Sequence, residues 1–235
     1  MYIFAIKEML HFSEKEFPQL PQLISFLLQK GEDNNRETNQ YVIAESIGEI
    51  SRISPTQMRN ILKDLPAMNE ARKCLVANSL RYAYEGKVPE DNFVSEDTEH
   101  YIQEIMNLTY DKSLNVKYGA MKSLNSIKYS YSFVIKEFVS AKFVDQLLDS
   151  LLIKAENIII VDYGVNKEKK DLGKPLRIEA FNFLTSIMHF RTLEAKFEEI
   201  VGKSIDKMSK FIIKFRLRNL QRFNPEEGSH HQKNL

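Results

Sequence analysis

One spacing of apolar residues recurs four times along the chain. After Gln40, Lys73, Lys117 and Arg177, an apolar or small residue follows at three, seven and ten positions. The four sets are Ile43, Ile47 and Ile50; Val76, Leu80 and Ala83; Ala120, Leu124 and Ile127; and Ala180, Leu184 and Ile187. Residues three and four apart are neighbours on a helix surface, so each set forms one stripe along a helix. The sequence therefore predicts four helices that bury equivalent faces against their neighbours.

The intervals between these four anchor residues predict a helical repeat. Successive anchors, at 40, 73, 117 and 177, lie 33, 44 and 60 residues apart. The first two intervals match the period of HEAT or armadillo repeats, roughly 33 to 47 residues. The third interval is longer, which predicts an insertion before the fourth stripe. We expect an all-α fold, an α-solenoid of HEAT-like helix pairs over residues 1–223, followed by a disordered polar tail at 224–235.

Capping residues and chain breakers predict where the helices begin and end. Ser54 and Pro55 suit the first positions of a helix, and Gly31 suits a helix end. Residues 2–12 carry an apolar stripe with no capping signal before it, which predicts the second helix of a pair whose first helix is missing. The predicted helices cover about 2–12, 18–30, 37–53, 54–65, 66–85, 99–110, 115–128, 132–154, 177–190, 193–201 and 205–223.

The insertion at about 155–174 differs in character from the rest of the chain. The β-branched run Ile158–Val161 favours a strand, and the polar residues after it favour a turn and a second strand. We therefore predict a β-hairpin. An isolated two-stranded hairpin is marginally stable in water, so we expect it to need a partner. Packing of Ile158, Ile160 and Tyr163 back onto neighbouring helices is an equally open alternative.

Composition agrees with an all-α chain and limits the classes of partner. The 235 residues are 43% hydrophobic and include only 8 Gly and 7 Pro, so few residues oppose helix formation. The 33 Lys and Arg against 32 Asp and Glu leave a net charge of +1, which predicts no global field toward nucleic acid or an anionic membrane. No leader and no membrane-spanning run of about 18 to 20 apolar residues is expected. We expect a chain of the cytoplasm or nucleus.

No pattern of catalytic, cofactor-binding or metal-ligating residues stands out. The sequence contains no glycine-rich phosphate loop, nucleophile elbow or metal-ligand cluster. The single cysteine, Cys74, falls within the helix of the second stripe, where we expect a small core residue. We therefore predict no enzyme activity, no cofactor and no metal, with a site built from groups distant in sequence as the remaining possibility.

One strongly basic stretch lies toward the end of the sequence. Its cations, opposed only by Asp206, are Lys203, Lys207, Lys210, Lys214, Arg216, Arg218 and Arg222. Such a face occurs on helices that bind nucleic acid or a membrane surface. An apolar stripe runs through the same residues, at Ile205, Met208, Ile212 and Phe215. That stripe would serve equally as solenoid core, and this is the interpretation we favour.

Several stretches in a fixed order carry a resemblance to a known family. They are residues 2–9, 41–50, 70–83, 115–127 and 133–139, followed by the insertion and by Pro175-Leu176-Arg177-Ile178-Glu179-Ala180-Phe181. In this order they resemble the C-terminal region of the cullin-associated, neddylation-dissociated proteins, which contains a TATA-binding-protein-interacting domain made of HEAT repeats. The resemblance covers roughly residues 2–190.

The resemblance implies a function for the hairpin. In that family, HEAT repeats wrap around a cullin, and a β-hairpin occupies the cullin surface that the substrate-receptor adaptor uses. It implies a non-enzymatic regulator of cullin-RING ubiquitin ligase assembly that competes with the adaptor. The hairpin strands would be residues 157–161 and 165–172. The implied partner-binding residues are Ile158, Ile160, Tyr163, Lys167, Lys169 and Lys170.

Members of the family are much longer than this chain, which lacks their N-terminal repeats. The expected partners are therefore the adaptor-binding end of a cullin and a companion chain that supplies those repeats. The alternative is a general HEAT-repeat scaffold for transport, phosphatase or transcription-linked factors, with cullin-independent partners on its concave face.

Overall fold

The computed structural model describes residues 2–33, 37–84, 94–153, 158–162, 167–171, 173–188 and residue 209. These residues are predominantly helical. The helices are α1 (Tyr2–Phe12), α2 (Leu20–Asp33), α3 (Glu37–Ile53), α4 (Pro55–Asp64), α5 (Glu70–Tyr84), α6 (Glu96–Leu108), α7 (Leu114–Ile127), α8 (Ser132–Phe138), α9 (Ala141–Leu151) and α10 (Gly173–Met188), with a 3-10 turn at Leu65–Ala67. Two strands, β1 (Ile158–Asp162) and β2 (Lys167–Asp171), lie between α9 and α10.

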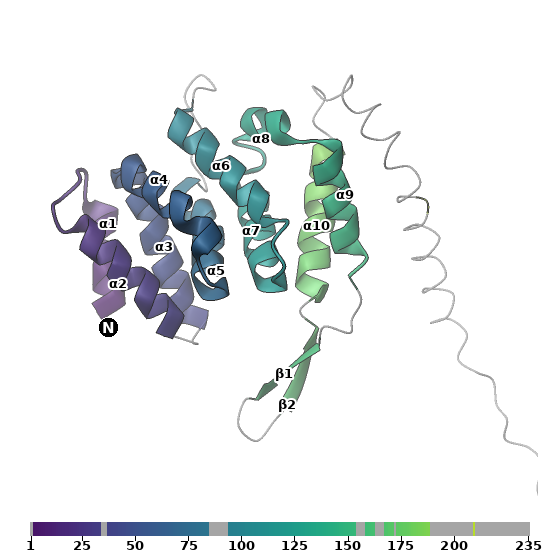
Figure 1. The fold of residues 1–235 in the computed structure, drawn as a ribbon, viewed down its shortest axis with the longest axis horizontal. Helices are drawn as coiled ribbons and strands as arrows, with labels where there is room; N and C mark the ends of the chain where they lie inside the picture. Colours follow the sequence, from purple (N-terminus) through teal and green to yellow (C-terminus); the bar gives the residue numbers. More distant parts are fainter. Residues whose placement is uncertain are drawn as a thin grey trace, which may run out of the picture.

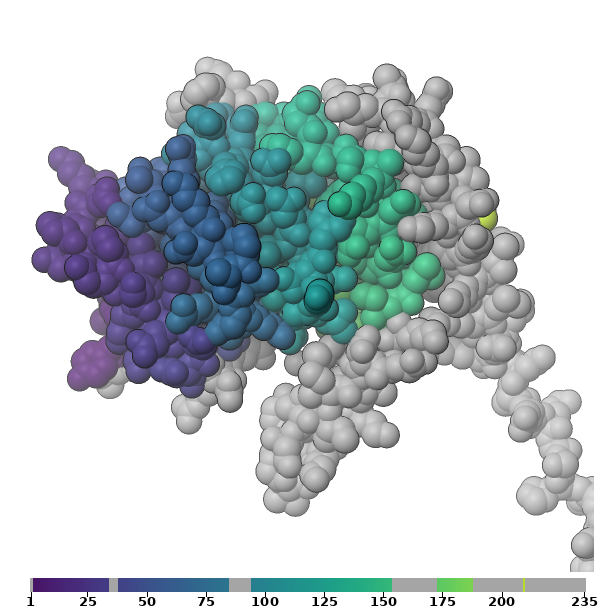
Figure 2. All heavy atoms as spheres, viewed as in Figure 1, coloured from purple at the N-terminus to yellow at the C-terminus, as the bar shows by residue number. Residues whose placement is uncertain are grey.

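The helices are arranged in two rows. In the first row α1, α3, α5, α7 and α10 follow one another, each in contact with the next (Figure 1). In the second row α4 contacts α6 and α6 contacts α8, while α2 packs against α3 and α5, and α9 packs against α10. The space-filling view shows the same order as successive colour bands across the molecule (Figure 2). Neighbours in sequence are therefore neighbours in space.

The four predicted apolar stripes form the core of the first row. They lie on α3, α5, α7 and α10, and all their residues are buried, with Leu184 the most exposed at 9%. Against these stripes pack buried residues of the second row, among them Leu27 of α2, Ile105 of α6 and Phe143 of α9. The prediction that equivalent faces of these four helices are buried is confirmed.

Serine caps set several helix starts. Ser54, Ser95, Ser113 and Ser140 each accept a hydrogen bond from a main-chain amide three residues on, at 3.2 to 3.3 Å. Because Ser140 caps a new helix and Val139 before it is extended, the single helix predicted over 132–154 is wrong and two helices, α8 and α9, take its place. The helix predicted to begin near residue 99 begins earlier, since α6 starts at Glu96.

Gly31 does not end α2, contrary to the prediction, because α2 continues to Asp33. A Cβ atom at this position would collide with the Leu75 side chain of α5. Glycine here lies at a close contact between two helices rather than at a helix end. The predicted helices at 193–201 and 205–223 and the tail at 224–235 lie outside the described residues.

Polar contacts hold the helices of the first row in register. Lys73 Nζ of α5 lies 3.0 Å from Asp111 Oδ2, in the turn before α7. Arg52 of α3 donates to three main-chain oxygens at the end of α1, at 3.0 to 3.1 Å. Asn125 of α7 donates to the main-chain oxygen of Glu179 in α10 at 2.8 Å. Each contact joins one helix of the row to the next.

Two glycines allow the stripe helices to approach closely. A Cβ atom at Gly48 of α3 would lie 2.7 Å from the Ser79 main-chain oxygen and 2.9 Å from the Ala83 main-chain nitrogen of α5. A Cβ atom at Gly119 of α7 would instead meet Nδ2 of the Asn78 side chain at 2.7 Å. Backbone cannot move aside as a side-chain end can, so the two sites differ in their tolerance of a methyl group.

We predict that Gly48→Ala destabilises the chain although alanine is the better helix former. The propensity gain is about 1 kcal/mol, whereas overpacking against backbone costs about 1–3 kcal/mol. Gly119→Ala is the matched control, because the Asn78 side chain can shift with the loss of one partly buried hydrogen bond, to the Cys74 main-chain oxygen, so it should lower the free energy of unfolding by less than Gly48→Ala does. Urea unfolding followed by circular dichroism measures both. A Gly48→Ala variant as stable as Gly119→Ala would contradict the close backbone contact.

Candidate binding surfaces

The paired strands β1 and β2 carry most of the binding residues expected from the sequence. The pair is antiparallel, with Ile158 opposite Asp171, Ile160 opposite Lys169, and Asp162 opposite Lys167. Residues directly opposite, and residues two apart in one strand, lie on the same face of a sheet. The register therefore places Ile158, Ile160, Lys167 and Lys169 on one face. The same face also holds Asp162 and Asp171, so it has two aliphatic, two cationic and two anionic positions.

The other expected residues are not brought to this face. Lys170 is opposite Ile159, so it belongs to the second face of the pair together with Val161 and Glu168. Tyr163 lies outside the described residues, as do the other residues between the two strands, 164–166. Figure 1 shows the strand pair extending away from the helices, beyond the ends of α9 and α10. A sheet of two strands has two outer edges, and an edge is where a partner strand can add.

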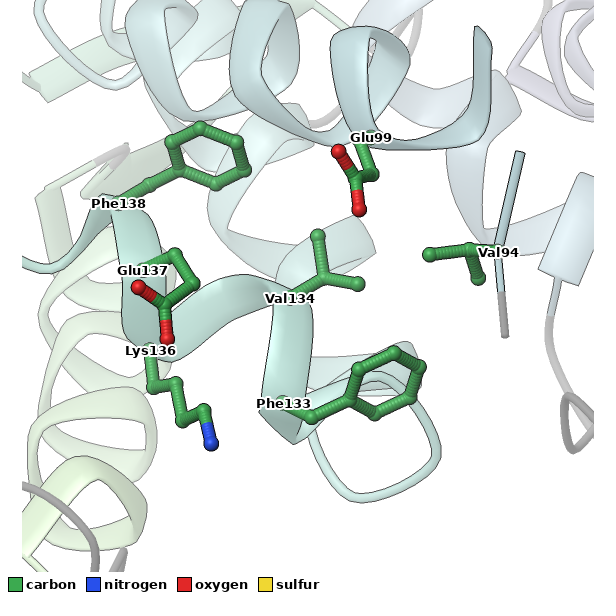
Figure 3. Close-up of a pocket in the computed structure, with 7 residues that line it drawn as sticks. All are labelled: Val94, Glu99, Phe133, Val134, Lys136, Glu137 and Phe138. Atoms are coloured by element: carbon green, nitrogen blue, oxygen red, sulfur yellow. The ribbon is translucent and has the colours of Figure 1, made fainter. Parts of the chain in front are cut away.

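An open pocket of about 370 Å³ lies between α6 and α8. Its apolar lining comes from Phe133, Val134 and Phe138 of α8 and from Val94, which precedes α6. The remaining lining residues are Glu99, Lys136 and Glu137. In Figure 3 the Glu99 carboxylate points from α6 toward the space between Val134 and Val94. An apolar side chain next to a cation would suit this lining, and no sequence pattern signalled it because α6 and α8 contribute separately.

A cluster of cations and tyrosines crosses α3, α5 and α7. The Arg81 guanidinium lies 4.4 Å from the ring centre of Tyr82 and 5.2 Å from that of Tyr41. Lys122 Nζ lies 5.4 Å from the ring centre of Tyr41 and 5.6 Å from that of Tyr118. Arg81 is only 8% exposed, so its two contacts with tyrosine rings are largely desolvated and each contributes about 1–2 kcal/mol, whereas Lys122 is partly exposed and its contacts are weaker. The cluster joins three helices of the row, which is a structural role.

The shifted pKa values in the described residues all lie further from neutrality than the ordinary values, and several of them belong to buried side chains. Burial raises the pKa of Tyr101 and that of Tyr84, and it raises the pKa of Tyr131 to about 12. Burial, and then the carboxylates of Glu70 and Asp111, raises the pKa of the Cys74 thiol to about 12. A general acid, base or nucleophile needs a pKa near the working pH, so these groups are poorly suited to catalysis. Cys74 packs against the core, as expected.

The part of the chain that the structure describes shows neither a metal site nor a membrane span. Within it, no three side chains of His, Cys, Asp or Glu are grouped as a metal ion would require. Nor does any helix there have the length and apolar character needed to cross a bilayer. In comparisons with known proteins, no family model matches the chain and no curated protein matches it. The function therefore has to be argued from the fold and the surfaces described above.

We predict that Cys74 reacts slowly with thiol reagents in the folded chain. A rise in pKa from 9.0 to about 12 lowers the thiolate fraction at pH 8 about a thousandfold, and the thiolate is the reactive species. Labelling should be at least about a hundredfold slower in the native chain than in urea. Its rate should keep rising tenfold per pH unit through pH 10, where the unfolded chain has levelled off.

The chain contains one cysteine, so the labelling signal has a single source. Native and unfolded rates that agree at pH 8 would show that the thiol is accessible and ordinary, and Cys74 would then have to be reconsidered as a nucleophile.

Proposed function

We propose that the chain is a non-enzymatic binding protein that docks on the adaptor-binding end of a cullin. In this role it competes with the substrate-receptor adaptor of a cullin-RING ubiquitin ligase and so promotes receptor exchange. The observation that carries the proposal is the strand pair inserted directly before the fourth stripe helix, α10, in a chain of otherwise helical elements. This is the order of elements that the resemblance to the cullin-associated, neddylation-dissociated proteins implies.

The proposal includes a finer description of the fold, an α-solenoid of HEAT-like helix pairs. Its support is the equivalence of positions along the first row. The residues three, seven and ten positions after the anchor are buried in each of α3, α5, α7 and α10. Each of these helices contacts the next. A row in which each unit touches only its neighbours is the arrangement expected of stacked repeats.

The binding surface we propose is the face of the strand pair that holds Ile158, Ile160, Lys167 and Lys169. Binding energy in protein interfaces concentrates in a few apolar anchors that are desolvated at the centre of the contact. The two isoleucine positions suit an apolar groove, and the two lysines and two aspartates around them leave this face with no net charge. Tyr163, between the strands, is the third anchor of this proposal. A cullin-binding role would place the chain in the cytoplasm or nucleus.

A general interaction scaffold is the second candidate, and α1 favours it. This helix exposes Tyr2 at 85%, Phe12 at 77%, Phe4 at 48% and Met9 at 47%. Large apolar side chains gathered on one helix mark an interaction surface. The same surface could receive the companion chain with further repeats, or a partner unrelated to cullins. Cullin binding through the strand pair separates the two candidates.

We predict that the purified chain binds the N-terminal part of a cullin from the same organism and is displaced by the adaptor. Replacing Ile158 and Ile160 together by Asp should weaken binding by at least about 2 kcal/mol for each residue, or about thirtyfold each. The matched control is Ile159→Asp, which adds a charge to the same strand on the opposite face. Its affinity should stay within about threefold of the wild type. Calorimetric titration with circular dichroism on each variant gives affinity and helicity.

Each outcome decides a different part of the proposal. Unaltered binding by the double variant, with helicity retained, would exclude the strand pair as the binding surface. Equal losses for Ile159→Asp and for the double variant would exclude the choice of face. A folded chain with no cullin affinity would contradict the cullin proposal and favour the scaffold candidate.

A further inference from the structure

The residue four positions after each anchor changes its environment at the last stripe helix. This residue is Ala44 in α3, Ala77 in α5 and Met121 in α7, and each of these is at most 1% exposed. In α10 the equivalent residue is Phe181, which is 52% exposed. Ile178, one turn earlier on the same side of α10, is 51% exposed. This position is therefore covered in α3, α5 and α7 but exposed in α10. There it carries Phe181, the largest apolar side chain of the four.

In the earlier helices this face is covered by the next helix of the row. Ala77 of α5 faces α7, since its Cβ lies 3.3 Å from a Cβ placed at Gly119. Eight positions after its anchor, Gly48 of α3 meets the backbone of α5. At the same position in α7, Asn125 donates a hydrogen bond to Glu179 of α10. The face that holds Ile178 and Phe181 is thus the one on which a further stripe helix would pack.

We propose that residues 205–215 of the same chain dock on this face of α10 as a helix, through their own apolar stripe. The segment has apolar residues at its first position and three, seven and ten positions later. The last three repeat the spacing of the earlier stripes, whose own first position is Gln, Lys or Arg. The four apolar residues of the segment are Ile205, Met208, Ile212 and Phe215. A helix with this pattern has an apolar face that must be covered, and α10 offers an open apolar face of the same kind.

The distribution of charge in the segment fits this placement. Its lysines lie at positions that fall on the opposite side of a helix from the apolar stripe. They are Lys203, Lys207, Lys210 and Lys214. Docking through the stripe would leave all of them in water, where an ammonium group is well hydrated. One arrangement therefore accounts for the apolar stripe and for the basic face.

The connecting residues are long enough for the segment to return. Helix α10 has 16 residues, so a parallel neighbour requires the chain to retrace about 24 Å. Packed helices are about 8–10 Å apart. Residues 189–204 number 16 and can span up to about 50 Å when extended. The connection has length to spare for a helix in the second row, as in the earlier repeats.

Limited trypsin digestion of the full chain tests the proposal, because the segment contains many cleavage sites. The sites between 203 and 222 are seven Lys and Arg residues. Their cleavage, followed by intact mass, should be at least about tenfold slower in the full chain than in a synthetic peptide of residues 201–223. The double variant Ile178→Asp, Phe181→Asp should raise cleavage to the peptide rate. Ile212→Asp should do the same from the other side of the contact.

The controls separate docking from a general loss of structure. Phe26→Asp places the same charge on an exposed aromatic residue of α2, which packs against α3 and α5, and it should leave the segment protected. Ile178 and Phe181 are half-exposed, so circular dichroism of their variants should show α1 to α10 intact. Protection should not depend on protein concentration, because the contact lies within one chain.

Three results would overturn the proposal. The first is equal cleavage in chain and peptide, and the second is protection that survives both α10 substitutions. The third is protection that appears only as sedimentation detects a dimer, or only with vesicles of anionic phospholipid, which would assign the stripe to a second copy or to a membrane surface. None of these results depends on cullin binding, so this proposal and the proposed function can fail separately.

Discussion

The close contact between successive stripe helices is the constraint on which the rest of the structure depends. At Gly48 the backbones of α3 and α5 come so near that a Cβ atom would lie 2.7 Å from a main-chain oxygen. Ser79 of α5 and Ser123 of α7 continue this use of small residues at helix contacts, and the Ser123 hydroxyl donates to the Ala77 main-chain oxygen at 2.6 Å. Each helix is buried only when its neighbour is in place. Stability is then a sum over neighbouring contacts, as in repeat proteins generally.

Charged side chains also contribute to the contacts between these helices. Burial alone would raise the pKa of Asp111, but hydrogen bonds from the Ser113 amide and from Lys73 outweigh it, and the pKa is lowered from 3.8. A carboxyl whose pKa is lower in the folded chain stabilises the fold above its unfolded pKa, and this contribution is lost as the pH falls through the folded pKa. The contact between α5 and the turn before α7 is therefore strongest near neutral pH. The contribution of this ion pair to the free energy of unfolding is modest, because both side chains remain partly exposed to solvent.

The parts of the fold that follow from local periodicity could be predicted from the sequence. The stripes repeat every three and four residues, and Ser54 followed by Pro55 signals a helix start within two residues. Contacts between distant residues could not be predicted in this way. Lys73 was recognisable as an anchor, but its partner Asp111 is 38 residues away. Gly31 illustrates the same limit, since a helix end and a close contact with another helix both favour glycine and only the position of Leu75 distinguishes them.

The candidate sites show the same division. A β-branched run is a local signal, so strand residues could be predicted, whereas the separation of Lys170 from Lys169 onto opposite faces depends on the pairing register. The pocket between α6 and α8 required both helices and left no signal in either. Phe181 is exposed, whereas its counterparts Ala44, Ala77 and Met121 are buried. This difference depends on which helix covers each residue, so it could not be predicted from the sequence. When similar helices are stacked, the same position can be compared from helix to helix. A large apolar side chain that is exposed where its counterparts are buried marks an interface.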